Sequence, residues 1–181
     1  GWSFNAAYVY AKAEGLLDSA RGSESLGTSQ LWNDPNTHIN AYGELPLERK
    51  HQLKVQSVVR GPFGISLSGY FRFLAGGHYT RSVSSKYLGI STGKMKNTSI
   101  YAETRGARKL PDVKILDLRL EKSFKFGNRF AIAAFADCFN VFNQGIATSV
   151  WTDSSNKARA FEQMTSISDP RIFQLGGRIE F

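Results

Sequence analysis

Polar and apolar residues alternate in six stretches of this 181-residue chain. Five of these stretches span residues 2–11, 51–59, 65–74, 115–124 and 129–139, and the sixth follows Pro170. A period of two places every second side chain on the same face of a β-strand. Each stretch has about the 9–11 residues that a tilted strand needs to cross a bilayer. The pattern therefore predicts an all-β chain with about six antiparallel strands.

The fourth and the last stretches show the alternation most clearly. In the fourth, one face carries Leu116, Leu118, Leu120 and Phe124, and the other carries Asp117, Arg119, Glu121 and Ser123. In the last, one face carries Phe173, Leu175, Gly177, Ile179 and Phe181, and the other carries Gln174, Gly176, Arg178 and Glu180. Both stretches predict strands with one apolar and one polar face.

The connections between the stretches alternate in length. Residues 60–64 (RGPFG) and 125–128 (KFGN) are short and carry the Gly, Pro and Asn residues of tight turns. Residues 12–50, 75–113 and 143–172 form long polar segments, and loops beyond about 12–15 residues are uncommon in compact soluble domains. Short periplasmic turns and long extracellular loops are typical of transmembrane β-barrels.

The same alternation has opposite meanings in water and in a membrane. A soluble sheet buries its apolar face, whereas a membrane barrel turns it outward to lipid and lines its lumen with polar residues. Aromatic residues near the strand ends favour the barrel because they suit the membrane interface; they are Trp2, Tyr8, Tyr10, Phe63, Tyr79, Phe124 and Phe126. We predict an antiparallel transmembrane β-barrel segment whose lumen-facing charged ladder is formed by Asp117, Arg119, Glu121, Asp137, Arg178 and Glu180.

Six strands are fewer than a single-chain barrel needs, because such barrels begin at about 8 strands. We therefore expect residues 1–181 to be a fragment whose upstream strands are missing. The sequence contains no run of about 18 apolar residues, so we predict no transmembrane helix. The single cysteine, Cys138, excludes a disulfide within the chain.

The formal net charge of +8 is unevenly distributed. Residues 75–112 hold seven Lys or Arg residues against two acidic residues, whereas the strand-like stretches are nearly balanced. The excess therefore lies in one long loop rather than on a continuous basic face, which argues against a nucleic-acid partner. A solvated loop is the simplest interpretation, and contact with anionic surface groups is the alternative.

Three segments together resemble the C-terminal barrel region of TonB-dependent receptors, the large outer-membrane transporters of Gram-negative bacteria. They are LERKHQLKVQSVVRGPFGISLSGYFRFLAGGHYTR, LPDVKILDLRLEKSFKFGNRFAIAAFADCFNVFN and DPRIFQLGGRIEF. The resemblance covers most of the chain outside residues 12–47 and 82–107. It is strongest to the Oar-like branch, whose members carry a carboxypeptidase-regulatory-like domain before the plug.

The resemblance implies a 22-stranded barrel with an N-terminal plug and a short box that contacts an energy-transducing inner-membrane protein. This sequence contains neither plug nor box. The implied location is the outer membrane, in contact with lipid and lipopolysaccharide. An aromatic-ended final strand implies an assembly signal read by the barrel assembly machinery, here formed by Phe173, Leu175, Ile179 and Phe181.

Other candidate sites are weaker. Trp32, Asn33, Asp34 and Asn36 could contact a ligand from the first long loop, although NDPN is also a strong turn sequence. Asp137, Asn140 and Asn143 could be ligand groups or could begin a loop through Asx turns, which we favour. The three histidines are too scattered for a recognisable metal site, and we expect no cofactor.

The leading functional hypothesis is an outer-membrane receptor that imports a large, unidentified nutrient by energy-dependent uptake. The first alternative is a structural or adhesive outer-membrane barrel without gated transport. The second is a barrel enzyme, for which His51 with Ser57, Ser66 or Ser68 is the only base and nucleophile pair available. No hydrolase, metalloprotease or phosphate-loop motif is present, so we expect no enzymatic activity.

Overall fold

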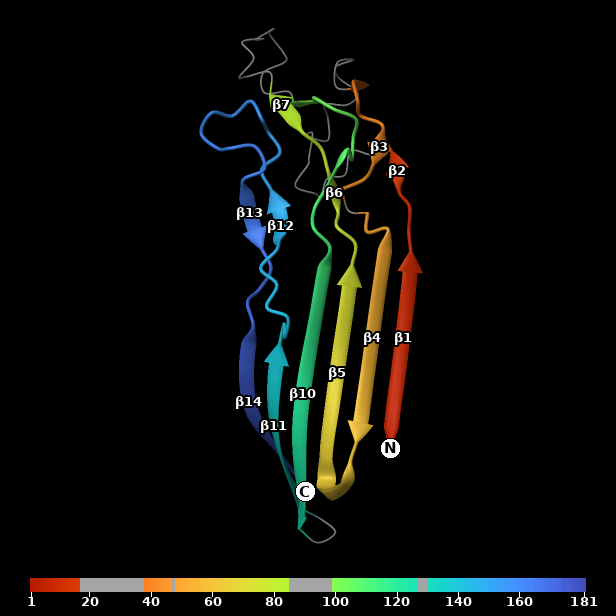
Figure 1. Ribbon diagram of the computed structural model, residues 1–181, viewed down its shortest axis with the longest axis vertical. Coiled ribbons are helices and arrows are strands. Elements are labelled where there is room, and N and C mark those ends of the chain that lie inside the picture. Colours follow the sequence, from red (N-terminus) through yellow and green to blue (C-terminus); the bar gives the residue numbers. More distant parts are fainter. Residues whose placement is uncertain (17–37, 47, 85–98, 127–129) are drawn as a thin grey trace.

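The structure is a computed structural model that describes residues 1–16, 38–46, 48–84, 99–126 and 130–181. Its largest element is a six-stranded antiparallel sheet whose strands lie in chain order (Figure 1). These strands are β1 (Trp2–Tyr10), β4 (His51–Arg60), β5 (Ile65–Leu74), β10 (Val113–Phe126), β11 (Phe130–Phe139) and β14 (Ile172–Glu180). The predicted all-β class and the six strands are confirmed, with ends that differ from the prediction by at most two residues.

The turn between β4 and β5 follows from its sequence. Pro62–Gly64 forms a single 3₁₀ turn, with positive φ angles of 59° at Phe63 and 73° at Gly64. Glycine is required at position 64 because a Cβ there would lie 2.4 Å from the carbonyl oxygen of Ser123. The predicted tight turn at residues 60–64 is confirmed, whereas the second predicted turn lies partly outside the described residues.

Four pairs of short strands extend from one end of the sheet (Figure 1). They are β2 (Glu14–Gly15) with β3 (Gly43–Glu44), β6 (His78–Tyr79) with β9 (Arg108–Lys109), β7 (Ser82–Ser84) with β8 (Ser99–Tyr101), and β12 (Ala147–Val150) with β13 (Met164–Ile167). The sequence pattern predicted these segments only as loops, and this prediction was incomplete because they also contain short strands. Strands of two to four residues are too short for a period of two to reveal them.

The strand register aligns the six apolar faces with one another. One row across the whole sheet consists of Trp2, Val59, Leu67, Leu120, Ala136 and Leu175. The adjacent row, on the opposite face, consists of Ser3, Val58, Ser68, Arg119, Asp137 and Gln174. A shift of one residue in any pair would mix these rows. The sheet therefore has one continuous apolar face and one mainly polar face.

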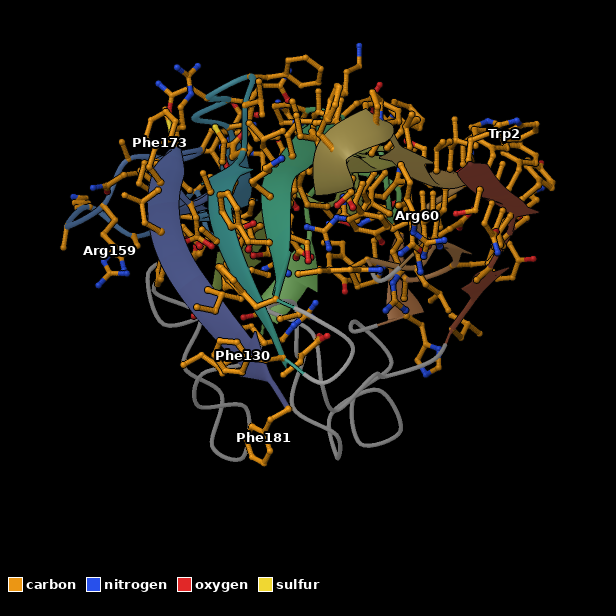
Figure 2. The ribbon with its side chains drawn as sticks, turned by 90° about the horizontal axis from the view of Figure 1, so that it is seen from below. Trp2, Arg60, Phe130, Arg159, Phe173 and Phe181 are labelled. Carbon is orange, nitrogen blue, oxygen red and sulfur yellow. The ribbon has the colours of Figure 1, made fainter. Side chains whose placement is uncertain are left out.

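The sheet is curved, and its apolar face is convex. Figure 2, seen from the turn end, shows the strands as an arc with Trp2 and Phe173 on the outside and Arg60 on the inside. The convex side chains are exposed, at 80% for Trp2, 72% for Phe173 and 83% for Leu175. Among the described residues only five hydrophobic side chains are buried: Ala41, Ala75, Tyr101, Val113 and Ala133. No described element covers the convex apolar face as a core would require.

The loop-side end of the sheet runs obliquely to the strands. Through the register, Tyr8 of β1 aligns with Lys114, and Phe173 of β14 aligns with Leu118. That offset is four residues; the last β1 pair at Tyr10 adds two and the last β14 pair at Ile172 removes one, so the end shifts by five residues across five strand steps. With about 3.3 Å per residue and about 4.8 Å per step, the strands lie about 35° from the perpendicular to that end.

No helix in the described part of the chain has both the length and the apolar character needed to span a membrane.

Candidate functional site

The candidate site is the concave polar face of the six-stranded sheet. All six residues of the predicted charged ladder lie on it: Asp117, Arg119, Glu121, Asp137, Arg178 and Glu180. Three of them come from β10, one from β11 and two from β14, the three strands at one side of the arc (Figure 2). The predicted role of these residues as lumen-facing groups depends on a closed barrel and stays a prediction.

Arg119 and Asp137 form the best-defined pair on this face. They lie directly opposite each other in the register, and Arg119 donates two hydrogen bonds, Nε to Oδ1 at 2.6 Å and Nη2 to Oδ2 at 2.8 Å. The guanidinium lies 4.4 Å from the centre of the Phe135 ring, and that ring covers Gly176 of β14. Asp137 is only 4% exposed. Two-point bonding and stacking together fix the guanidinium in one orientation.

The other charged residues divide into two arrangements. Arg178 contacts Glu180 of its own strand at 2.8 Å and Glu121, two strands away, at 3.3 Å. Asp117 has no ion pair with a described residue, and its Oδ1 accepts the backbone N–H of Asn140 at 2.8 Å. The ladder therefore consists of paired charges and one carboxylate, that of Asp117, which binds the backbone just after β11.

Asn140 and Asn143 lie just beyond β11, where the loop begins. Both have positive φ angles, 50° and 52°, which Asn tolerates better than most residues. The Asn140 amide donates to the carbonyl of Asp169 at 2.7 Å, and the Asn143 side-chain oxygen accepts the backbone N–H of Arg171 at 3.0 Å. These bonds agree with the loop interpretation of both asparagines and leave their side chains engaged.

An open hollow of about 350 Å³ lies on the polar face. The hollow is lined by two neighbouring rows of side chains on this face. One row is Gln56, Tyr70 and Asp117, and the other is Ser68, Arg119 and Asp137, with Phe139 at the border of the hollow. The side chains of Gln56, Ser68 and Tyr70 form no hydrogen bond with any described residue. The hollow therefore combines a fixed ion pair with unengaged neutral polar groups.

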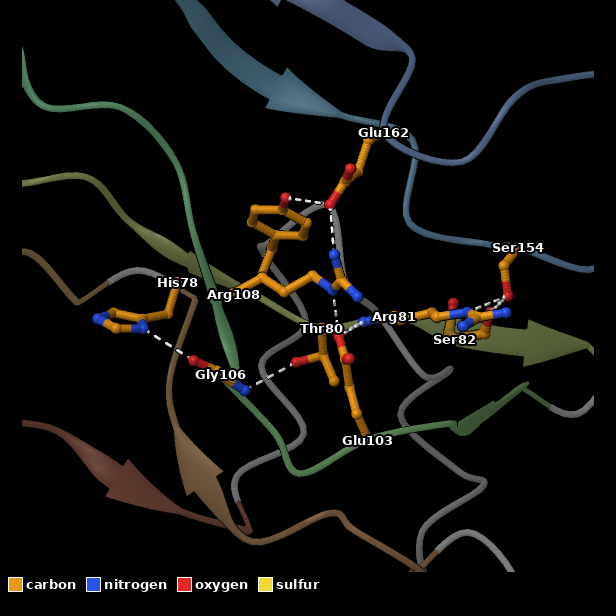
Figure 3. Close-up of polar contacts among 10 residues, drawn as sticks. His78, Thr80, Arg81, Ser82, Glu103, Gly106, Arg108, Ser154 and Glu162 are labelled. Atoms are coloured by element: carbon orange, nitrogen blue, oxygen red, sulfur yellow. Dashed lines mark hydrogen bonds and ion pairs between the residues drawn. The ribbon is translucent and has the colours of Figure 1, made fainter.

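A second polar cluster lies above the sheet, where two long loops meet (Figure 3). Glu162 accepts hydrogen bonds from the Tyr79 hydroxyl at 2.8 Å and from Arg108 Nη1 at 2.7 Å. Arg108 also donates to Glu103 at 2.8 Å, and its guanidinium lies 4.9 Å from the centre of the Phe161 ring. We refer to Tyr79, Glu103, Arg108, Phe161 and Glu162 as the loop cluster. It joins the β5–β10 connection to the β11–β14 connection.

The loop cluster shifts the proton affinity of its members. The Tyr79 hydrogen bond and the Arg108 guanidinium lower the pKa of the Glu162 carboxyl below its ordinary value of 4.5. Burial and the bond to Glu162 raise the pKa of Tyr79 to about 12. Both shifts favour the protonation states that hold the two loops together at neutral pH.

Backbone contacts extend the junction between the same two loops. The Ser82 N–H donates to the carbonyl of Thr152 and the Ser154 N–H donates to the carbonyl of Ser82, both at 2.9 Å. Arg81 Nε donates to the Ser154 hydroxyl at 2.8 Å. Arg105 is only 4% exposed, and Arg108 is held by two carboxylates. The interpretation of residues 75–112 as a solvated loop is therefore wrong for Arg105, whereas Arg108 is partly exposed and held by ion pairs.

The remaining sequence-based candidates have separate positions. Trp32, Asn33, Asp34 and Asn36 lie outside the described residues. Of the predicted assembly-signal residues, Phe173, Leu175 and Ile179 are exposed on the convex face, and Phe181 follows the last residue of β14. Tyr79, named above among the aromatic residues suited to a membrane interface, belongs to the loop cluster, where its hydroxyl donates to Glu162.

The only base and nucleophile pair that the sequence suggested is not assembled. His51 lies on the apolar face, where its Nδ1 is 2.8 Å from the Tyr8 hydroxyl. Ser66 and Ser68 lie on the polar face, and Ser57 is six residues along β4 from His51. In the described ranges, no group of three or more His, Cys, Asp or Glu residues has the geometry of a metal site.

Sequence reasoning missed both the hollow and the loop cluster. The alternation did place Gln56, Ser68 and Tyr70 on polar faces, but only the register shows that they are neighbours. Glu162 and Arg108 are separated by 54 residues, and no local pattern links them.

Comparisons of this chain with protein-family models, curated proteins and solved structures found no match.

Proposed function

We propose that this chain is part of the transmembrane β-barrel of a TonB-dependent outer-membrane receptor that takes up a large nutrient. One observation carries the proposal: six strands in register present a continuous convex apolar face that no described element covers. A soluble sheet would bury that face, whereas a bilayer supplies the apolar environment that the face lacks.

The geometry of the sheet supports the barrel. The oblique loop-side end corresponds to a strand tilt of about 35°, at the lower end of the range of about 35–45° for membrane barrels. The outer edges of β1 and β14 have no partner strand among the described residues. In lipid each unsatisfied N–H or C=O would cost several kcal/mol, so both edges would pair with further strands of the same barrel.

Lys122 is a charged residue on the apolar face near the turn end of the sheet, opposite Ile65, the first residue of β5. Its ammonium group donates to the carbonyl of Phe63 in the β4–β5 turn and lies 5.3 Å from the centre of the Phe124 ring. A lysine that extends along apolar surface toward the turn end keeps its charge near a membrane interface. The position of this lysine therefore supports the proposed orientation of the strands across a bilayer.

The proposed environment has two sides. Lipid and lipopolysaccharide would contact the convex face, and the concave face would line the lumen, where the plug of such receptors lies. The energy-transducing inner-membrane protein would act through a plug and box outside this sequence. The loop cluster would lie on the extracellular side, because it is at the end with the long connections (Figure 1).

A matched pair of labels tests the two faces. The complete gene product with Cys138→Ser receives either Leu175→Cys or Gln174→Cys, and each new thiol carries an environment-sensitive dye in lipid vesicles. We expect a lipid-phase nitroxide to quench the dye at position 175 and aqueous iodide to quench it at position 174. Equal quenching of both dyes by iodide would contradict membrane insertion.

A second experiment separates a receptor from a structural or adhesive barrel. Cross-linking in cells should capture the complete protein together with the energy-transducing inner-membrane protein. A barrel that passes the quenching test but never cross-links to that protein, under conditions that capture a known receptor, would support the structural alternative.

A further inference from the structure

We propose that the hollow on the polar face binds a neutral polyhydroxylated ligand, a short sugar, as a subsite on the route of the imported nutrient. The inference rests on the proposed function, because it places the hollow inside the lumen of a transport barrel. It adds a substrate class and a set of contacting residues. The volume of the hollow, about 350 Å³, lies within the range of about 300–1,000 Å³ for small-molecule sites.

The unengaged groups of the hollow match the hydrogen bonding of a sugar. Gln56 offers an amide that both donates and accepts, and Ser68 and Tyr70 offer hydroxyl groups that do the same. Asp117 has one carboxylate oxygen left after accepting the N–H of Asn140. A sugar hydroxyl is also both donor and acceptor, so neighbouring hydroxyls could satisfy these groups together.

The charge of the hollow argues against anionic ligands. Arg119 is the only cation that lines it, and its Nε and Nη2 are already bonded to Asp137. Asp117 leaves the lining with one net negative charge. A carboxylate or phosphate would meet this charge in the lining, and the nearest cations on the same face that have no ion pair with a described residue, Lys54 and Arg72, lie in the next row of the register, outside the lining. A neutral ligand avoids the repulsion.

The floor of the hollow is fixed before any ligand arrives. Arg119 is held by Asp137 on one side and by the Phe135 ring below it. The side chains that line the hollow come from β4, β5, β10 and β11, four consecutive strands of one sheet. Tyr70 and the Phe139 ring at the border supply apolar surface for the C–H groups of a sugar ring. Rigid groups lose little entropy on binding.

Isothermal titration of the complete protein in detergent micelles tests the inference. The probes are maltotriose, cellotriose and chitotriose as neutral sugars, trigalacturonate as an anionic sugar, and trialanine as a peptide. We expect at least one neutral trisaccharide to bind saturably and trigalacturonate to bind at least 10-fold more weakly than that sugar. Tighter binding of trigalacturonate or trialanine than of every neutral sugar would overturn the assignment.

Variants locate the binding. Tyr70→Phe removes one hydroxyl, and Gln56→Leu removes one amide of similar size; each should weaken the bound sugar by about 5-fold, as the loss of one neutral hydrogen bond does. Gln174→Leu is the matched control, because Gln174 lies on the same face outside the hollow and should change nothing. Equal affinities for Tyr70→Phe, Gln56→Leu and the unaltered protein would overturn the site.

The result can be separated from a failure of the proposed function. The heat-dependent shift in gel mobility that folded barrels show is measured on the same samples. A protein with that shift that binds none of the three neutral trisaccharides up to about 10 mM, near the weak end of measurable affinity, overturns the sugar inference alone. A protein without the shift in any detergent overturns both.

Discussion

Glycine at position 176 is predicted to be required for the packing of Phe135 against Arg119 on the polar face. A Cβ at this position would lie 2.4 Å from Cζ and 2.6 Å from Cε2 of Phe135. Those contacts are about 1 Å or more shorter than the usual optimum of about 3.5–4.0 Å between carbon atoms. In Gly176→Ala the ring must therefore move, and it would move toward the Arg119 guanidinium stacked above it.

The expected cost follows from that displacement. Overpacking of a fitted site costs about 1–3 kcal/mol of unfolding free energy. Within this total, loss of the stack between Arg119 and Phe135 accounts for about 0.5–1 kcal/mol, because Arg119 is partly exposed. Replacing Gly with Ala also restricts the unfolded chain, which stabilises by about 0.4–1 kcal/mol wherever the new residue fits.

Gly177→Ala is the matched control for this perturbation. Its Cβ would lie on the convex face, 3.5 Å from the carbonyl oxygen of Ala133, which is an ordinary contact. The effect on the unfolded chain is the same in both variants, so their difference isolates the contact with Phe135. We expect Gly176→Ala to be less stable than Gly177→Ala by about 1–3 kcal/mol in urea titrations of the micelle-embedded protein, followed by gel mobility.

A double-mutant cycle decides whether the ring is the cause. In a Phe135→Ala background the space above Gly176 is empty, so the added Cβ should cost no more than about 0.5 kcal/mol. Equal stability of Gly176→Ala and Gly177→Ala would refute the reasoning. A penalty for Gly176→Ala that persists unchanged in the Phe135→Ala background would refute it as well.

Two further predictions concern polar pairs. In the loop cluster the pKa of Glu162 is lowered, so its contribution to stability is present above pH 4.5 and is lost as the pH falls through the lowered pKa. The pKa of Tyr79 is raised, so its contribution to stability is present below pH 10 and is lost between pH 10 and about 12. Trp151, whose carbonyl oxygen accepts the N–H of Glu162 at 2.9 Å, should report both steps in its fluorescence. Tyr79→Phe should remove the alkaline step and move the acid step to a higher pH, because the Tyr79 hydrogen bond is the largest cause of the lowered pKa of Glu162. A flat profile in the unaltered protein would contradict the cluster. On the sheet, Arg119→Met should cost about 1–3 kcal/mol in urea titrations because it leaves Asp137 without its donors, and Arg119→Met with Asp137→Leu should restore most of it; additive effects would argue against the pair.

The strands themselves could be predicted because their information is local. In β10, Leu116, Leu118 and Leu120 alternate with Asp117 and Arg119, and this pattern is visible without any partner strand. The 3₁₀ turn after β4 was equally local, because its Gly and Pro residues restrict or free particular φ angles. The four pairs of short strands were missed because two to four residues cannot display a period.

The contacts across the sheet could not be predicted with the same ease. The sequence placed Arg119 and Asp137 on polar faces, but their two-point bond needs the register between β10 and β11 to be exact within one residue. Glu162 was not a candidate at all, because its partners Tyr79 and Arg108 lie 83 and 54 residues away. Interactions of this kind depend on how loops meet, which no local periodicity encodes.

The sequence alone determined that this protein is all-β, which residues alternate, and that each strand has an apolar and a polar face, because side-chain direction in a strand follows from backbone geometry. Only the tertiary structure decided that the six apolar faces join into one convex surface and that Gln56, Tyr70 and Asp117 become neighbours. The reason is physical: hydrogen-bonded register and sheet curvature arise between strands, so they appear only when all the strands are in place.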